Sequence, residues 1–131
     1  MSSDRTTGID KRPVNLALWT MKFPITAIIS ILHRLTGFFL FLLIPIVLYA
    51  WQFSLSSEDN FNIAKSNLNL WYVKLLVWSL LSALLYHLMA GVRHLLMDMH
   101  IGDSKQAGKI SSYVVLVLTS VLCILLGVYL W

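Results

Sequence analysis

The sequence predicts an all-α integral membrane protein with three transmembrane helices. Two observations carry this prediction: the composition is strongly apolar, and the apolar residues are gathered into three long runs. Hydrophobic residues make up 58% of the 131 positions and charged residues only 12%, which is about half the charged share of an ordinary soluble domain. The length suits one domain, so we expect a single membrane-anchor domain over residues 1–131.

The first apolar run contains no charged residue between positions 35 and 53, and its apolar character extends back toward residue 27. We place the first span at about residues 27–53, after an N-terminal segment of residues 1–26. Because no small-residue cleavage pattern follows the run, we interpret it as a retained anchor and not as a signal peptide. Pro45 lies inside this run, and a membrane helix is expected to kink at such a proline.

The second and third runs are also long enough to cross a bilayer. Residues 75–92 and 110–131 contain no Asp, Glu, Lys or Arg. About 20 residues at ~1.5 Å each cross a hydrocarbon core of ~30 Å. We place these spans at about residues 71–95 and 108–131, with a short interfacial turn in the polar segment that joins the first span to the second.

Basic residues are distributed unequally between the two sides of these spans. Eight of them precede or open the first span or lie between the second and third: Arg5, Lys11, Arg12, Lys22, Arg34, Arg93, Lys105 and Lys109. Only Lys65 and Lys74 lie on the other side. The positive-inside rule therefore predicts a cytoplasmic N-terminus and a C-terminus on the opposite, outer side. Four aromatic residues suit the outer interface: Trp71, Tyr72, Tyr129 and Trp131.

Several functional classes are excluded by what the chain contains. Its basic residues flank apolar runs and do not form a soluble basic face, so nucleic-acid binding is not expected. The single cysteine, Cys123, can supply neither an internal disulfide nor the thiolates of an iron–sulphur cluster. There is no C-x-x-C-H motif, so any haem must be held non-covalently.

Polar residues near the inner end of the second span share one helical face. His87, Gly91 and His94 are spaced i, i+4, i+7, and His87 lies roughly 9 Å inside the boundary at Arg93. An intramembrane imidazole is a functional hypothesis by default. Two interpretations stay open: His87 hydrogen-bonds a neighbouring helix beside a small packing residue, or it is an axial haem ligand. His100, in the following loop, is expected in solvent.

The first span carries a similar polar face at the same side of the membrane. Ser30, Arg34 and Gly37 are spaced i, i+4, i+7, with His33 adjacent. Ser30 and Arg34 both offer hydrogen-bond donors, and Arg34 keeps its charge. Taken alone, Arg34 is equally explained as a side chain that reaches lipid phosphates.

The two polar faces are expected to converge at the cytoplasmic side. His33, Arg34, Arg93 and His94 would then surround one small volume, and Asp98 is the only acidic residue in the second motif. Such an excess of positive charge favours an anionic partner, and two haem propionates would fit it.

Two stretches together resemble a known family. "KRPVNLALWTMKFPITAIISILHRLTG" followed by "YHLMAGVRHLLMDMH" is similar to the cytochrome b large membrane-anchor subunit of succinate dehydrogenase (respiratory complex II). The resemblance covers both motifs, the segment between them and the three-span layout. Many members begin R-P-x-S-P-H, whereas this chain reads "RPVNLAL", which resembles the gamma-proteobacterial branch.

The resemblance implies roles for individual residues. His87 matches the axial ligand of a b-type haem iron. Ser30 and Arg34 match side chains that line the ubiquinone pocket. His33, Arg34 and His94 match positions near the haem propionates. No residue of this chain is expected to be catalytic by itself.

The resemblance also implies partners and a location. Succinate would be oxidised on a flavoprotein subunit, and electrons would pass through an iron–sulphur subunit to ubiquinone, linking the tricarboxylic acid cycle to the respiratory chain. A second small anchor subunit would supply the other haem ligand, in a bacterial inner membrane with a periplasmic C-terminus and lipid around the bundle. Three alternatives stay open: a haem-free structural anchor, a fumarate reductase anchor, and a small transporter or channel subunit.

Overall fold

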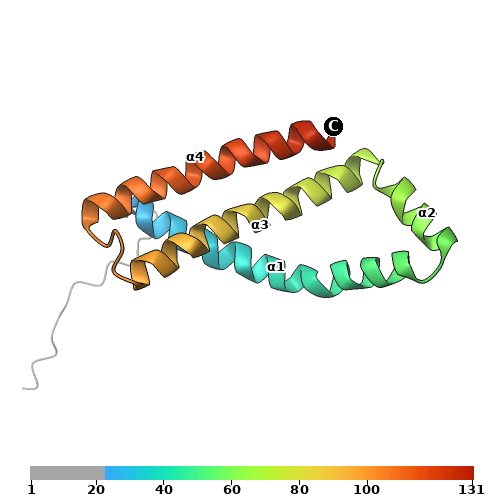
Figure 1. Cartoon of the computed structure of the whole chain (residues 1–131), viewed down its shortest axis with the longest axis horizontal. Helices are drawn as coiled ribbons and strands as arrows, with labels where there is room; N and C mark the ends of the chain where they lie inside the picture. Colours follow the sequence, from blue (N-terminus) through green and yellow to red (C-terminus); the bar gives the residue numbers. More distant parts are fainter. Residues whose placement is uncertain (1–22) are drawn as a thin grey trace, which may run out of the picture.

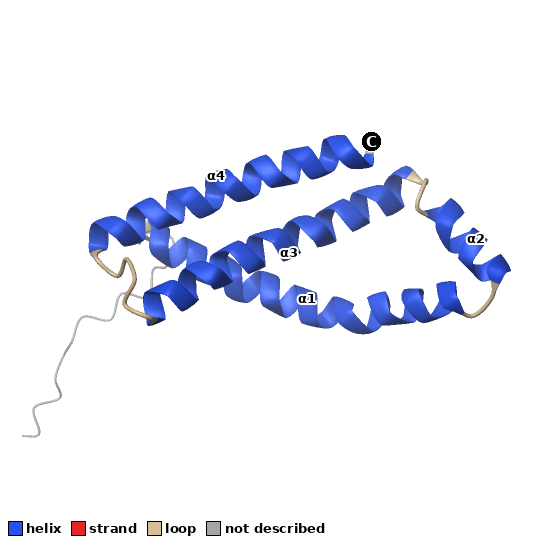
Figure 2. Ribbon diagram, viewed as in Figure 1, coloured by secondary structure: helices blue, strands red, loops and turns tan. Residues whose placement is uncertain are grey.

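The computed structural model describes residues 23–131, which form four helices. These are α1 (Ile25–Leu55), α2 (Glu58–Asn67), α3 (Trp71–Asp98) and α4 (Lys105–Leu130). Figure 1 gives their arrangement, and Figure 2 shows that this part of the chain contains only helices and loops. The predictions for residues 1–22, including Arg5, Lys11, Arg12 and Lys22, lie outside the described residues.

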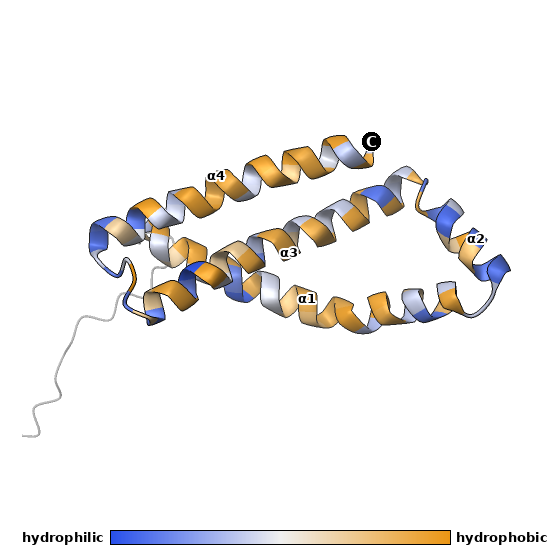
Figure 3. Ribbon diagram, viewed as in Figure 1, coloured by the Kyte–Doolittle hydropathy of each residue, from blue (hydrophilic) through white to orange (hydrophobic). Residues whose placement is uncertain are grey.

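The three long helices are each apolar and long enough to cross a membrane, which confirms the predicted all-α class with three spans. Their apolar residues cover most of the length of α1, α3 and α4, while the polar residues gather in α2 and near the helix ends (Figure 3). Each helix starts and ends within three residues of the predicted span.

Helix α3 lies between the other two long helices and contacts both (Figure 1). Helix α4 runs alongside α3 over most of its length. Helix α1 crosses α3 near the loop that joins α3 to α4, contacts α4 there as well, and diverges from both toward α2. Where the three helices cross, they bury a core of Ile29, Ala90 and Val115. This core is small because most apolar side chains of a membrane protein face lipid and not each other.

At the α2 end of the bundle, hydrogen bonds and a close contact join α3 to α4. The indole nitrogen of Trp78 donates to the carbonyl of Cys123 at 2.9 Å. Gly127 makes room for this ring, since a Cβ there would lie 3.3 Å from the indole nitrogen. The ammonium group of Lys74 donates to the carbonyl of Leu130 at 3.0 Å and so satisfies one of the carbonyls left free at the end of α4.

Proline and a capping serine shape the segment from α1 to α2. Pro45 lies within α1 and lacks the N–H that would donate to the carbonyl of Phe41; α1 changes direction along its C-terminal half in Figure 1. The polar connection contains a helix of 10 residues, α2, and not only the short turn expected. Its N-terminus is capped by Ser57, whose hydroxyl accepts from the backbone N–H of Asn60 at 3.1 Å.

The loop between α3 and α4 reverses the chain through two residues in the left-handed region. These are His100 (φ 60°) and Gly102 (φ 72°). The side chain of His100 is 89% exposed and lies 3.4 Å from the carboxylate of Asp103. His100 is therefore in solvent, as expected from its position in the loop.

Candidate functional site

Three histidines from α1 and α3 meet where these helices cross. The rings of His33 and His87 are stacked, with centroids 4.2 Å apart and planes inclined by 13°. The ring of His94 lies 5.2 Å from that of His33, tilted by 45°. His87 and His94 thus share the face of α3 that the sequence predicted, and that face is turned toward α1. We call these three residues the histidine cluster.

Two glycines allow the rings to approach so closely. A Cβ at Gly37 on α1 would lie 2.8 Å from Cε1 of His87, and a Cβ at Gly91 on α3 would lie 3.2 Å from Nε2 of His33. Each glycine therefore lies opposite the histidine of the other helix. One interpretation of the sequence made Gly91 a small packing residue, and the group that packs against it is the ring of His33 on α1.

The ring of His87 is oriented by α1 through its Nδ1 atom. Nδ1 lies 3.1 Å from the backbone carbonyl of His33 and 3.3 Å from the hydroxyl of Thr36. A carbonyl only accepts hydrogen bonds, so Nδ1 is the donor and Nε2 carries the lone pair. Within residues 23–131, Nε2 of His87 has no hydrogen-bond partner. A histidine held in this tautomer by its second nitrogen is the usual form of a metal-binding imidazole.

Thr36 and Tyr86 also lie at this crossing, although the sequence motifs did not predict them as site residues. The Thr36 hydroxyl lies 2.9 Å from the carbonyls of Leu32 and His33, and the Tyr86 hydroxyl donates to the carbonyl of Ile29 at 3.0 Å. Thr36 lies three residues after His33 and so shares its face of α1, and Tyr86 lies four residues before the buried Ala90 on α3. This spacing places both near the helix contacts but does not show what they bind.

His94 contributes a buried atom without a partner. Within the described part of the chain, its Nε2 is buried and makes no hydrogen bond. Buried polar atoms in folded proteins nearly always have a partner. A group outside residues 23–131, whether from a bound molecule or another polypeptide segment, is therefore expected to complete this position.

Ser30 and Arg34 lie on α1 beside the histidine cluster. Ser30 is half-buried and Arg34 is exposed. Neither side chain makes a hydrogen bond or ion pair with another residue between positions 23 and 131. Arg34 directly follows His33 on α1. The site thus combines three imidazoles with a guanidinium whose donors are available to a ligand.

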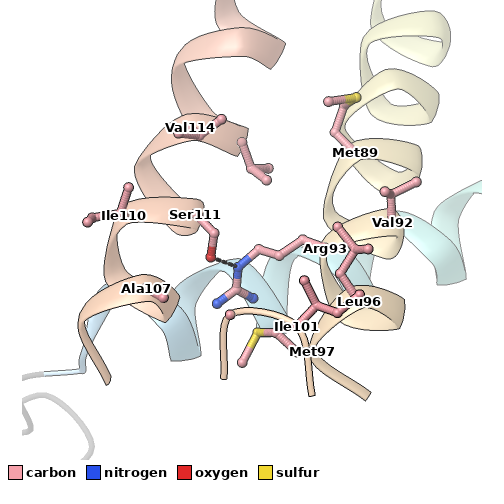
Figure 4. A pocket seen from close by; sticks show the side chains of 12 residues that line it. Met89, Val92, Arg93, Leu96, Met97, Ile101, Ala107, Ile110, Ser111 and Val114 are labelled. Atoms are coloured by element: carbon pink, nitrogen blue, oxygen red, sulfur yellow. Dashed lines mark hydrogen bonds between the residues drawn. The ribbon is translucent and has the colours of Figure 1, made fainter. Parts of the chain in front are cut away.

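Arg93 does not join this site, contrary to the expected convergence. Its Nε donates to the hydroxyl of Ser111 at 2.9 Å, and its Nη2 donates to the carbonyl of Gly108 at 3.2 Å. Both partners lie on α4, and Figure 4 shows the bond to Ser111. The reason is helical geometry, because neighbouring residues on an α-helix point about 100° apart. With His94 facing α1, Arg93 faces α4.

Gly37→Ala is expected to destabilise the chain by about 1–3 kcal/mol, because the new methyl group would overlap the His87 ring and force a shift. Gly108→Ala is the matched control: its Cβ would make an ordinary contact at 3.7 Å with Thr26, so it should cost little. Denaturant titration of the purified protein in micelles measures both free energies of unfolding. Equal values for the two variants would contradict the close packing described.

Comparison with known proteins shows the family of this chain. Residues 9–126 match the family described as succinate dehydrogenase/fumarate reductase transmembrane subunit. The chain is 43% identical over 122 residues to the succinate dehydrogenase cytochrome b556 subunit of Coxiella burnetii, covering 92% of this chain and 98% of that protein.

More distant relatives carry the same name. The cytochrome b556 subunit of Rickettsia felis is 36% identical over 128 residues, covering 98% of this chain and all of that protein. The corresponding subunit of Paracoccus denitrificans is 35% identical over 103 residues, covering 76% and 78%. The chain therefore belongs to the family of succinate dehydrogenase and fumarate reductase transmembrane subunits, among the cytochrome b membrane anchors of succinate dehydrogenase.

Proposed function

We propose that this chain ligates haem b together with a second anchor subunit and forms part of the ubiquinone-reduction site of succinate:ubiquinone oxidoreductase. One observation carries the proposal. His87 lies inside a membrane span, donates through Nδ1 to the carbonyl of His33 at 3.1 Å, and keeps Nε2 free of any partner within residues 23–131. An imidazole prepared in this way is suited to bind iron through Nε2.

The residues present fit a b-type haem. Among the described residues no group of three or more His, Cys, Asp or Glu could hold a bare metal ion, whereas a haem requires only axial ligands from protein. His87 would supply one of them, and His33, Arg34 and His94 would face the propionates. When bound, the haem supplies a one-electron redox centre. The buried Nε2 of His94 would gain a partner in a propionate oxygen.

Ser30 and Arg34 would line the quinone pocket on the same stretch of α1. Reduction of a quinone to a quinol takes two electrons and two protons, and negative charge develops on a carbonyl oxygen. The Ser30 hydroxyl would donate a hydrogen bond to one carbonyl, and the Arg34 guanidinium would stabilise the developing charge in a partly dry site. Arg34 lies in the first third of α1, and a position near the cytoplasmic interface would let protons enter from water.

The reaction requires partner subunits, because the motifs for succinate oxidation and for iron–sulphur clusters are not in this sequence. A flavoprotein subunit would oxidise succinate, and an iron–sulphur subunit would deliver the electrons. A small anchor subunit would provide the second axial histidine. The family name also includes fumarate reductase, so a fumarate-reducing anchor is the nearest alternative. The relatives that share most of the chain are named as succinate dehydrogenase subunits, and this favours the succinate-oxidising direction.

The distribution of charge supports a cytoplasmic location for the α3–α4 loop. Arg34, Arg93, Lys105 and Lys109 lie toward the end of the bundle that holds this loop, and Lys65 and Lys74 lie toward the α2 end. Four exposed aromatic residues also mark the α2 end: Trp71, Tyr72, Tyr129 and Trp131. In a bacterial inner membrane, the positive-inside rule then places the C-terminus in the periplasm.

His87→Ala is expected to abolish or shift the b-type haem signal of the assembled complex, because the axial nitrogen is removed. Reduced-minus-oxidised absorbance spectra of membranes that co-express the partner subunits measure this. His100→Ala is the matched control, since the His100 side chain is 89% exposed, and its spectrum should equal that of the wild type. Identical spectra for His87→Ala and wild type, with equal amounts of assembled complex, would refute the assignment.

Ser30→Ala and Arg34→Gln are expected to lower succinate:ubiquinone reductase activity about tenfold to a hundredfold through the loss of a donor to the quinone carbonyl. Succinate oxidation with an artificial soluble acceptor should be unchanged, because that assay bypasses the quinone site. Ser79→Ala is the control: Ser79 is exposed on α3 and its hydroxyl bonds only to the Leu75 carbonyl. Full quinone reductase activity in both site variants would exclude them from the pocket.

Cysteine labelling tests the orientation. Ser104→Cys, in the α3–α4 loop, is expected to react with a membrane-impermeant maleimide only after the inner membrane is opened. Ser57→Cys, at the start of α2, is expected to react in spheroplasts with an intact inner membrane. The native Cys123 lies within α4 and is replaced by Ala in both variants. The opposite labelling pattern would reverse the orientation.

A further inference from the structure

A groove separate from the histidine cluster lies between α3 and α4, next to the loop that joins them. Its volume is about 460 Å³. Apolar side chains from both helices line most of it, among them Met89, Val92, Leu96, Ile110 and Val114. Figure 4 shows the guanidinium of Arg93 between the two helices at the loop end of this groove. We call it the Arg93 groove.

The charge of Arg93 is almost completely buried. The residue is only 5% exposed, and an arginine side chain does not lose its proton in proteins. Its two hydrogen bonds go to the neutral oxygens of Ser111 and Gly108. Within residues 23–131 no Asp or Glu carboxylate lies within the 4.0 Å ion-pair distance of Arg93. A buried cation without an anion is unfavourable, so an anion is expected at the guanidinium donors that remain free.

The position of the groove in the bundle indicates the size and shape of that anion. Arg93 precedes the end of α3 at Asp98 by a little more than one turn, roughly 7–8 Å along the axis, which is a depth that a lipid headgroup reaches. From there the apolar lining runs along α4 to Val114, deeper in the hydrocarbon. The exposed Lys105 and Lys109 add positive charge at the same end. A ligand that fits has an anionic head and a long apolar chain.

We propose that the Arg93 groove binds one anionic phospholipid of the leaflet at the α3–α4 loop. The phosphate accepts hydrogen bonds from the Arg93 guanidinium, and one acyl chain lies along the apolar lining between α3 and α4. The bound lipid neutralises the buried charge and stabilises the pairing of these two helices. The proposal does not depend on haem or quinone binding, because Arg93 faces away from the histidine cluster.

Native mass spectrometry of the purified, assembled complex tests this proposal. The complex is delipidated in detergent and incubated with phosphatidylglycerol, with phosphatidylcholine of the same acyl chains, or with inorganic phosphate. Val114→Trp fills the groove without altering the hydrogen bonds of Arg93; Val114 is 54% exposed. Val117→Trp is the matched control, since Val117 is 63% exposed on α4 and does not line the groove. Arg93→Gln removes the charge.

The wild type and Val117→Trp are expected to retain one phosphatidylglycerol at least about tenfold more tightly than phosphatidylcholine. Both lipids offer the same phosphate oxygens, but the quaternary ammonium of phosphatidylcholine cancels the net negative charge that the buried guanidinium attracts. Arg93→Gln and Val114→Trp are expected to lose that retention. If Arg93→Gln fails to assemble, the comparison of the two tryptophan variants remains decisive.

Three results would overturn the proposal. The first is equal retention of the two lipids by the wild type, or equal retention of phosphatidylglycerol by the two tryptophan variants. The second is Arg93-dependent thermal stabilisation by inorganic phosphate with no retained lipid, which would make this a small-anion site. The third is failure of Val114→Trp, but not of Val117→Trp, to assemble with the other subunits, which would make the groove a protein interface.

Discussion

A polar group inside the hydrocarbon core has no water to bind, and this constraint places most of the polar side chains in the bundle. Trp78 and Lys74 donate to carbonyls of α4. Tyr86 donates to a carbonyl of α1, and Arg93 donates to a hydroxyl and a carbonyl on α4. All four donors lie on α3. Helix α3, which lies between α1 and α4, is therefore joined to both by hydrogen bonds in an otherwise apolar bundle.

The same constraint explains why the α1–α3 crossing is the candidate site. There the polar groups are not all satisfied within the described chain: Nε2 of His87 and Nε2 of His94 have no partner, and the side chains of Ser30 and Arg34 bind no other described residue. These groups lie around the same helix crossing. Their concentration there supports a bound molecule, and the proposed haem and quinone would satisfy both the imidazole nitrogens and the donors of α1.

The two helix contacts of α3 differ in a way that suits an anchor subunit. Helix α4 follows α3 over most of its length, whereas α1 meets α3 at one crossing and then diverges (Figure 1). The approach at that crossing depends on Gly37 and Gly91. Beyond it, the C-terminal half of α1 exposes large apolar side chains, including Phe41, Ile46 and Trp51. Lipid or another apolar helix can cover this surface, and the second anchor subunit proposed above would be such a partner.

The sequence by itself determined the number of spans, their approximate bounds and the residues that share a face. Long uncharged runs have one stable form in a bilayer, and the helical period makes the positions of His87, Gly91 and His94 coincide on one side. The same period places Ser30, Arg34 and Gly37 on one face of the first span. These features are local, because each depends on one helix and the solvent around it.

Only the tertiary structure decided which neighbour each face meets. Proximity in the sequence suggested that Arg93 would join His94, but adjacent side chains diverge around the helix axis, and Arg93 binds α4 instead. The stacking of His33 on His87 and the bond from His87 to the His33 carbonyl depend on how closely α1 and α3 cross. The distance between α1 and α3 depends on contacts between the two helices, among them the packing of Gly37 and Gly91 against the opposite histidine rings. The residue pattern of either helix alone does not predict this distance.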